Sequence, residues 1–310
     1  MTLTPYARFT NVTDACPPTG LVVPIITPVD DQDQVDEPAY RAQISHLIEA
    51  GVDALFIGGT AGEGPLLEIN QWQRMVEIAR DQVGDQVPLL GGVTDTSTAR
   101  VIDKIQRLEK LDYRFFVVTP TYYVPSNTYD EQLRLYGACR EATDRMEMIA
   151  YNIPSTTGVT LPVELLVDLA NRKWIRIAKE SSGDQQYLWN LIEAGKDVGL
   201  SILVGDERLI AFGLVSGGSG IVPVCANFEP ETYVGAVTAY REGQFKELHK
   251  CQNRTMQLRR DVIGADGKWL AGVKYAVSRL GIGNGRAVAP LSGLTEKEQH
   301  LIDAAVSSAT

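Results

Sequence analysis

The chain has 310 residues, of which 44% are hydrophobic and 22% charged, and its formal net charge is −10. This length suits a single α/β barrel with a helical extension, and the composition is that of a globular protein. Acidic and basic residues are interspersed without a basic stripe, which argues against a nucleic-acid-binding role. The sequence has no apolar stretch long enough to span a bilayer and no signal-peptide pattern, so we expect a cytoplasmic protein that does not engage a membrane.

From Gly20 onward, short apolar runs alternate with amphipathic segments. Each run is rich in Val, Ile, Leu and Phe, as expected for a strand buried on both faces of a parallel sheet. The runs lie at residues 21–28, 54–59, 87–93, 115–120, 148–153, 175–181, 200–206 and 220–224. Helical periodicity follows them near residues 38–48 and at 71–83, 98–111, 130–142, 162–171, 185–196 and 208–215.

Eight consecutive strand–helix units predict an α/β fold, the (β/α)8 or TIM barrel, with a C-terminal helical extension. We expect an N-terminal arm at residues 1–19, the barrel at 20–229, and closing and appended helices at 230–310. A doubly wound sheet is the alternative, but no early GxGxxG motif supports it. In such a barrel the loops after the strands form the functional face, so the polar and glycine-rich strand ends should meet at one pocket.

A lysine, Lys179, closes the sixth apolar run, and a tyrosine, Tyr151, ends the fifth at the same level. Lysine is rarely buried without a partner, so the alternative to a functional amine is a salt bridge with Glu180 or Glu63. Burial disfavours the charged form, and a neutral amine can form a Schiff base with a ketone. A neighbouring phenol can move the protons that this chemistry requires. The pair predicts carbon–carbon bond chemistry on a 2-oxo acid.

The glycine-rich segment 58–64 follows the second run, and its backbone N–H groups suit a carboxylate or an oxyanion. Within it, Thr60 adds a hydroxyl that can pass a proton, while Glu63 fits a cap or a loop clamp. A tight turn without a ligand is the alternative. At the fourth run Tyr122 and Tyr123 are adjacent, so at most one should face the pocket, and packing against another subunit is the alternative role.

The histidines and cysteines argue against a metal site. The three histidines each fall within a helical pattern, away from the glycine-rich strand ends: His46, His249 and His300. The four cysteines form no CxxC pair and are expected to be reduced: Cys16, Cys139, Cys225 and Cys251.

Taken together, these segments resemble one family, the Schiff-base (class I) pyruvate-dependent aldolases and lyases of the dihydrodipicolinate synthase and N-acetylneuraminate lyase superfamily. The resemblance runs from about Gly20 to the final helices. It rests on a GxxGE loop, TPxYY, YNxP, an IxxKE lysine and a GxxG segment, in the family's order. It implies the barrel, a homo-oligomer (tetramer or dimer), pyruvate and an aldehyde as small-molecule partners, and no cofactor beyond a covalent imine.

The resemblance also implies roles for the residues that match. Lys179 matches the Schiff-base lysine, and Tyr151 the catalytic tyrosine that shuttles protons and contacts the pyruvate carboxylate. Thr60 matches the hydroxyl residue that links this tyrosine to a second one. Tyr122 matches the second tyrosine, which family members reach across a subunit interface.

Further matches and two departures concern the substrate. The Thr60–Ala61 backbone matches the cradle of the pyruvate carboxylate, and Val222 matches the apolar residue beside the imine. Thr156 stands where dihydrodipicolinate synthases carry an arginine for the aldehyde substrate's carboxylate, and a hydroxyl cannot imitate a bidentate guanidinium. Ala61 replaces a common hydroxyl residue, which removes one hydrogen bond to the carboxylate.

The seventh run ends in Gly205, Asp206 and Glu207, and the last two match the acidic pair with which sialic acid lyases hold substrate hydroxyls. Such carboxylates suit a polyhydroxylated chain and repel an anionic tail, and Ser181 adds a hydroxyl contact. We therefore expect retro-aldol cleavage of a 2-oxo-3-deoxy sugar acid, or an N-acetylneuraminate-like substrate, to pyruvate and an aldehyde. The alternatives are a dehydratase acting on the same acids, a dihydrodipicolinate synthase, and a non-catalytic barrel that binds a 2-oxo acid.

Overall fold

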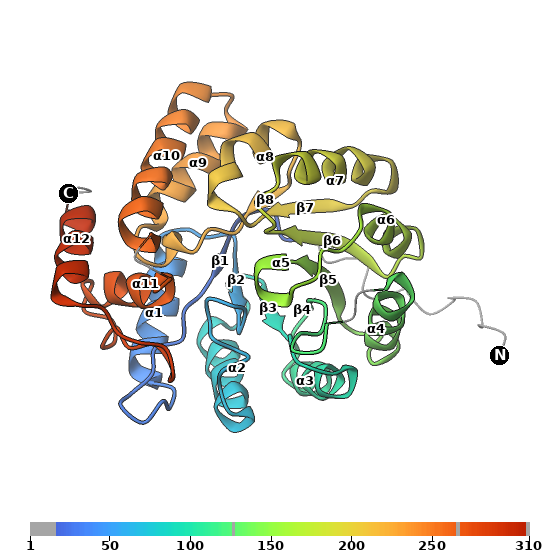
Figure 1. Ribbon diagram of the computed structural model, residues 1–310, viewed down its shortest axis with the longest axis horizontal. Coiled ribbons are helices and arrows are strands. Elements are labelled where there is room, and N and C mark those ends of the chain that lie inside the picture. Colours follow the sequence, from blue (N-terminus) through green and yellow to red (C-terminus); the bar gives the residue numbers. More distant parts are fainter. Residues whose placement is uncertain (1–16, 126–127, 265–266, 308–310) are drawn as a thin grey trace.

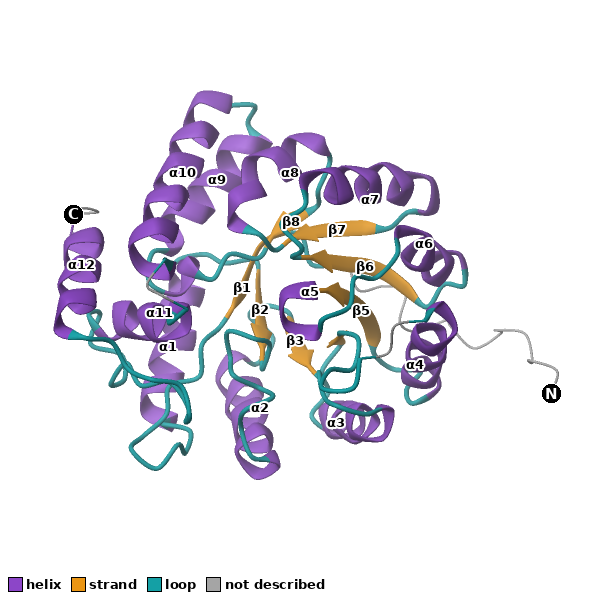
Figure 2. Ribbon diagram, viewed as in Figure 1, coloured by secondary structure: helices purple, strands orange, loops and turns teal. Residues whose placement is uncertain are grey.

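The computed structural model describes residues 17–125, 128–264 and 267–307. Most of the predicted N-terminal arm, together with Cys16, lies outside these residues. Eight parallel strands form a closed barrel in which each strand pairs with the next along the chain and the last pairs with the first (Figure 1). Helices surround this barrel on its outside (Figure 2). The predicted (β/α)8 fold with C-terminal helices is confirmed.

The strands coincide with the predicted apolar runs, although two of them begin one residue earlier, at Gly20 and Glu147, and most are shorter than the runs. Their bounds are β1 (Gly20–Pro24), β2 (Ala54–Ile57), β3 (Leu89–Gly92), β4 (Phe115–Val118), β5 (Glu147–Asn152), β6 (Ile175–Glu180), β7 (Ser201–Val204) and β8 (Gly220–Ile221). The glycines and prolines that end several runs leave the barrel as loops, because these residues do not favour a strand interior.

In the described part of the chain, seven helices between successive strands cover the barrel's outer face. They are α1 (Glu37–Glu49), α2 (Ile69–Val83), α3 (Thr98–Lys110), α4 (Tyr129–Glu141), α6 (Val163–Asn171), α7 (Gln185–Val198) and α8 (Ile210–Ser216). Their ends carry local signals. Thr128 and Glu131 form a capping box that begins α4, and Gly199, with a φ of 67°, ends α7 in the left-handed conformation.

One short helix follows β5. Pro154 begins this helix, α5 (Pro154–Thr157). Proline fits the first helical position because its missing N–H would have no partner there. Gly158, with a φ of 72°, ends the helix after one turn. Figure 1 shows α5 near the centre of the barrel view, where it can reach the functional face.

Two buried apolar clusters hold the fold together. One lies between the barrel and its helices. The other lies inside the barrel and contains Val22, Ala54, Phe56, Leu90, Phe115, Val117, Ile149, Tyr151, Ile153, Ile177, Leu203 and Val222. Alternate residues of each strand point inward, so this cluster supports any side chain placed above it at the strand ends.

The C-terminal part forms α9 (Pro230–Arg241), α10 (Phe245–Leu258), a π-helical turn (Arg259–Ile263), α11 (Trp269–Ser278) and α12 (Glu296–Ser307). The π-helical turn contacts α10, α11 and α12, and α11 also packs against α12. A buried ion pair ties α11 to the barrel, because Lys274 contacts Glu63 in the loop after β2. Glu63 also accepts a hydrogen bond of 2.6 Å from the backbone N–H of Val288, so it is the loop clamp that was predicted. In the described part of the chain, no helix has the length and apolarity needed to cross a membrane.

Candidate active site

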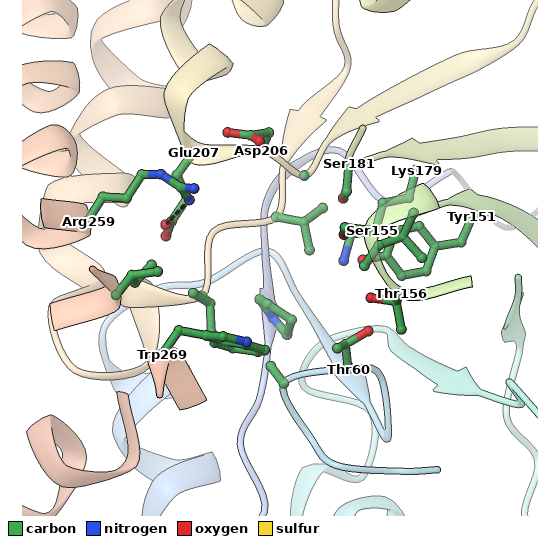
Figure 3. Close-up of a pocket in the computed structure, with 17 residues that line it drawn as sticks. Thr60, Tyr151, Ser155, Thr156, Lys179, Ser181, Asp206, Glu207, Arg259 and Trp269 are labelled. Carbon is green, nitrogen blue, oxygen red and sulfur yellow. Dashed lines mark ion pairs between the residues drawn. The ribbon is translucent and has the colours of Figure 1, made fainter. Parts of the chain in front are cut away.

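A cavity of about 370 Å³ lies where the strands end (Figure 3). Every predicted site residue except Tyr122 lines it. These are Thr60, Ala61, Tyr151, Thr156, Lys179, Ser181, Gly205, Asp206, Glu207 and Val222. Loops that follow β2, β5, β6, β7 and β8 supply most of them, so residues far apart in the sequence meet at one place, as expected for this fold.

Lys179 lies in an apolar surrounding inside this cavity. It is 5% exposed, and its Nζ atom lies 4.2 Å from the ring centroid of Tyr151 and 4.8 Å from that of Phe56. The lysine and Tyr151 are register partners on β6 and β5, which fixes their side chains at the same level. Because burial disfavours the ammonium form, the pKa of Lys179 is lowered to about 7. A large share of this amine is therefore uncharged at neutral pH.

The predicted alternative, a salt-bridged Lys179, is wrong. Among the described residues its amine has no ion pair, and both candidate carboxylates bind elsewhere. Glu180 accepts a hydrogen bond of 2.6 Å from Nδ2 of Asn152, its register partner on β5. Glu63 is engaged by α11, as described above. The Asn152–Glu180 bond instead braces the two strand ends that carry the amine and the phenol.

Tyr151 supplies a buried phenol. The residue is 4% exposed. Burial raises the pKa of Tyr151 to about 12, opposed by the nearby hydroxyls of Ser181 and Thr60. The phenol is therefore protonated at neutral pH, with two hydroxyls at hand that can pass a proton.

Two glycines keep space for these groups. A Cβ atom at Gly205 would lie 2.0 Å from Oγ of Ser181 and 2.9 Å from Cε of Lys179, so only glycine leaves both side chains in place. A Cβ atom at Gly64 would lie 2.1 Å from the carbonyl oxygen of Gly58, so the loop after β2 folds tightly on itself. That compact loop presents Thr60 to the cavity.

The predicted acidic pair is present, but each carboxylate has an arginine partner. Asp206 accepts hydrogen bonds of 2.9 and 2.7 Å from Nε and Nη2 of Arg208. Burial acts to raise the pKa of Asp206, but Arg208 outweighs it and lowers that pKa. Glu207 is 3% exposed, burial raises its pKa, and its Oε2 lies 3.8 Å from Nη1 of Arg259. The wall is charge-compensated, which the sequence did not indicate.

Tyr122 lies apart from the other predicted residues. It lines a neighbouring cavity of about 480 Å³, which shares Thr60, Thr156 and Trp269 with the first. The adjacent Tyr123 is 89% exposed, so only one of the two tyrosines faces a cavity, as predicted. Thr60 is therefore one of the residues that line both the cavity of Tyr122 and that of Lys179.

Sequence reasoning missed a second group of lining residues. Arg259, Ile263 and Trp269 come from the C-terminal extension, and Ser155 comes from α5. The apolar periodicity of the extension is that of ordinary packed helices, so it does not mark these residues as part of a site. The one visible signal was Trp269, two residues after Gly267, because such a large aromatic side chain needs an apolar surface to pack on.

The collected groups suit one kind of chemistry. An uncharged amine can add to a carbonyl, and a phenol with neighbouring hydroxyls can transfer protons. Within residues 17–125, 128–264 and 267–307, no three His, Cys, Asp or Glu side chains are grouped so that they could hold a metal ion.

Comparisons with known proteins all point to one protein family. The model of the dihydrodipicolinate synthetase family matches residues 17–309. An "uncharacterized DapA-like lyase" of Halobacterium salinarum is 32% identical over 92% of each chain. A 4-hydroxy-tetrahydrodipicolinate synthase of Bartonella bacilliformis is 30% identical over 94% of this chain and 97% of that protein.

A solved structure shares the architecture. YagE, a prophage protein of the dihydrodipicolinic acid synthase family from E. coli K12, was solved in complex with pyruvate. It superposes with a TM-score of 0.89 at 25% identity, over 94% of this chain and 98% of its own. The chain described here therefore belongs to the dihydrodipicolinate synthetase family of lyases.

Proposed function

We propose that the protein is a class I, metal-independent aldolase that cleaves a 2-oxo-3-deoxy sugar acid, or an N-acetylneuraminate-like acid, reversibly to pyruvate and an aldehyde. The observation that carries the proposal is the buried amine of Lys179 beside the phenol of Tyr151, in a cavity lined by hydroxyls. Burial lowers the pKa of Lys179 to about 7, so a neutral nucleophile is available without a metal or an organic cofactor.

In the first step Nζ of Lys179 adds to C2 of the 2-oxo acid, and loss of water gives a protonated imine. The substrate carboxylate binds at the backbone of Thr60 and Ala61, while Val222 covers the apolar side of the imine. Tyr151 is the proton donor for the departing hydroxyl, because burial keeps its phenol protonated. This step leaves a positively charged iminium on Lys179, beside the ring of Tyr151.

In the second step the carbon–carbon bond breaks. The positive iminium lowers the pKa of the adjacent phenol, so Tyr151 can act as phenolate and take the proton from the C4 hydroxyl. The C3–C4 bond then breaks, its electron pair moves to the iminium as an enamine, and an aldehyde leaves. Protonation of the enamine at C3 and hydrolysis of the imine release pyruvate and restore Lys179.

Thr60 completes the proton path in this proposal. It lines both cavities, so it can relay a proton between Tyr151 and Tyr122. We propose a homo-oligomer, a dimer or a tetramer, in which the tyrosine segment meets another subunit. The strongly exposed Tyr123 beside it supports such a contact.

The remaining lining residues support a hydroxylated tail. Thr156 and Ser155 present hydroxyls from α5, and Thr156 occupies the place of the arginine that would hold an aldehyde's carboxylate. Across the cavity, arginines offset the charges of Asp206 and Glu207. This wall combines guanidinium donors with carboxylate acceptors, and such a combination suits hydroxyl groups, which both donate and accept hydrogen bonds.

A second candidate is dihydrodipicolinate synthase activity, the condensation of pyruvate with aspartate semialdehyde. The name of the Bartonella relative favours it. Thr156 argues against it, because a hydroxyl cannot bind a carboxylate as a bidentate arginine does. A dehydratase would use the same Lys179 imine and release an unshortened dioxo acid.

The test of the proposal is covalent trapping followed by product analysis. Pyruvate and borohydride should leave a reduced adduct on Lys179, located by mass spectrometry of the digested protein, and Lys179→Met should abolish it. Lys246→Met, a change at an exposed lysine of α10, is the matched control and should keep the adduct.

Three assays then separate the reactions. Pyruvate formed from a 2-oxo-3-deoxy sugar acid supports the aldolase, and an unshortened dioxo acid supports the dehydratase. Turnover of aspartate semialdehyde with pyruvate, followed with a coupled reductase, supports the synthase. Absence of any adduct on Lys179 would refute all three.

A further inference from the structure

The wall opposite Lys179 contains an arginine from outside the barrel. Arg259 is the first residue of the π-helical turn that follows α10. Figure 3 shows its guanidinium directed towards Glu207, across the cavity from Lys179 and Tyr151. The next residue, Arg260, has a side chain that is 69% exposed and pairs with Asp261, whereas that of Arg259 is 31% exposed. Of these two adjacent arginines, it is therefore Arg259 that lines the cavity.

The guanidinium of Arg259 has N–H donors that no described residue of the chain accepts. Its Nη1 lies 3.8 Å from Oε2 of Glu207, which is longer than a hydrogen bond. Within the described part of the chain it makes no hydrogen bond. Arg208 differs, because two of its nitrogens are bound to Asp206. The two arginines of this wall thus have different roles: one is occupied by its carboxylate, and the other faces the cavity with free N–H groups.

Glu207 provides a fixed acceptor beside these donors. Its Oε1 accepts a hydrogen bond of 2.9 Å from the backbone N–H of Cys225, and the hydroxyl of Tyr233 lies 3.4 Å from the same oxygen. Among the described residues, its other oxygen, Oε2, has only the Cys225 thiol at 3.9 Å and the guanidinium at 3.8 Å. The carboxylate is therefore held through one oxygen and leaves the other open.

We propose that Arg259 and Glu207 together bind one hydroxyl group of the substrate's tail, which makes Arg259 a specificity residue. This inference rests on the proposed aldolase function and names the part of the substrate that the far wall selects. An oxygen atom about 2.8 Å from both Nη1 and Oε2 fits between them, since the two atoms lie 3.8 Å apart. The hydroxyl accepts from the guanidinium and donates its own hydrogen to Glu207.

The same geometry discriminates between tails. A hydroxyl can donate or accept, so it suits Glu207 in either protonation state. A terminal carboxylate would gain from Arg259 but would meet the Glu207 carboxylate within the same gap, and like charges at such a distance repel. A tail without a hydroxyl would leave the donors of Arg259 unpaired in a partly buried site, which costs binding energy.

The packing of the C-terminal helices holds Arg259 in position. A Cβ atom at Gly272 of α11 would lie 2.3 Å from the carbonyl oxygen of Val262, so glycine is required for α11 to lie against the π-helical turn. Val262 itself is fully buried. Trp269, at the start of α11, lines the cavity as well. The arginine is thus presented by a fixed turn.

The test compares Arg259→Leu with Arg260→Leu, a matched loss of an arginine one residue away. Three substrates are used: a 2-oxo-3-deoxy aldonic acid with a hydroxylated tail, 4-hydroxy-2-oxopentanoic acid, which has no hydroxyl beyond C4, and a 2-oxo-3-deoxy diacid. Arg259→Leu should lower kcat/KM for the hydroxylated acid about tenfold to a hundredfold, as expected for a charged hydrogen bond, and change it less than about twofold for the short acid. Arg260→Leu should leave both values unchanged.

Other results would overturn the inference. Equal losses for the hydroxylated and short acids, or wild-type turnover that is fastest with the diacid, would each do so. Pyruvate trapping on Lys179 in the wild type and in Arg259→Leu separates this outcome from failure of the aldolase proposal, because trapping does not involve the tail. If the leucine variant does not fold, judged by its thermal melting, Arg259→Gln is used instead. The glutamine variant should show the same selective loss, and its absence would overturn the inference.

Discussion

Replacement of Lys179 by methionine should stabilise the protein while abolishing the chemistry. Methionine has a similar length and no charge, so it fits the apolar surrounding formed by Phe56 and Tyr151. The wild-type amine is 5% exposed and has no carboxylate partner in the described residues, so its charged form is disfavoured in the folded state. Active-site groups of this kind often lower stability in exchange for reactivity.

The size of the effect follows from the pKa of Lys179. Burial lowers it from 10.5 to about 7, so folding at neutral pH either releases the proton or buries a charge. The unfolded chain binds more protons than the folded one between these values, so wild-type stability rises with pH across that window. The difference corresponds to about 4 kcal/mol at pH 7 and falls to about 1–2 kcal/mol at about pH 9.5.

Urea denaturation of wild type and Lys179→Met at both pH values, at one protein concentration, measures this difference. The variant should be more stable at pH 7, by up to about 4 kcal/mol, and its advantage should shrink at the higher pH. Lys246→Met, at an exposed position, should stay within about 0.5 kcal/mol of wild type at both. A variant no more stable than wild type at pH 7, or an advantage independent of pH, would refute a buried, neutral amine.

Three further changes test the surroundings of the amine. Tyr151→Phe should lower kcat about 10²- to 10⁴-fold while borohydride still traps pyruvate, and unchanged turnover would contradict a proton-transfer role. Gly205→Ala places a methyl group 2.9 Å from Cε of the lysine and should lower stability by about 1–3 kcal/mol and reduce the yield of trapped imine. Gly293→Ala, whose new Cβ would have no neighbour within 4 Å, is its control in the same melting and trapping assays. Glu63→Gln leaves the buried amine of Lys274 without its ion pair and should lower the free energy of unfolding by about 3–5 kcal/mol; a loss below about 1 kcal/mol in urea denaturation would argue against the clamp.

The barrel and the reactive strand ends could be predicted because their signals are local. Continuous apolar runs identify buried parallel strands, and periodic segments identify the helices between them; α3, for example, was expected at 98–111 and spans Thr98–Lys110. Once eight units are in series, the fold places all strand ends on one face. Lys179 and Tyr151 then follow, because each lies one residue before the end of its own strand.

The charge pattern of the cavity could not be predicted, because it depends on contacts between distant segments. The ion pair joins Glu207, in the loop after β7, to Arg259, in the C-terminal extension 52 positions later. Periodicity places both on helical or turn segments but does not say which helix face docks on the barrel mouth. The short helix α5 escaped prediction for a related reason, since Pro154 is compatible with a turn or a helix start and only the surrounding structure decides.

The Glu63–Lys274 ion pair makes the appended helices part of the catalytic scaffold. Glu63 lies three positions after Thr60, so the loop that would cradle the substrate's carboxylate is anchored from a helix more than two hundred residues later. A shortened version limited to the eight strand–helix units would leave an unpaired carboxylate in an apolar interior. Any attempt to build a minimal catalyst from this chain must therefore retain α11 or redesign the loop that it secures.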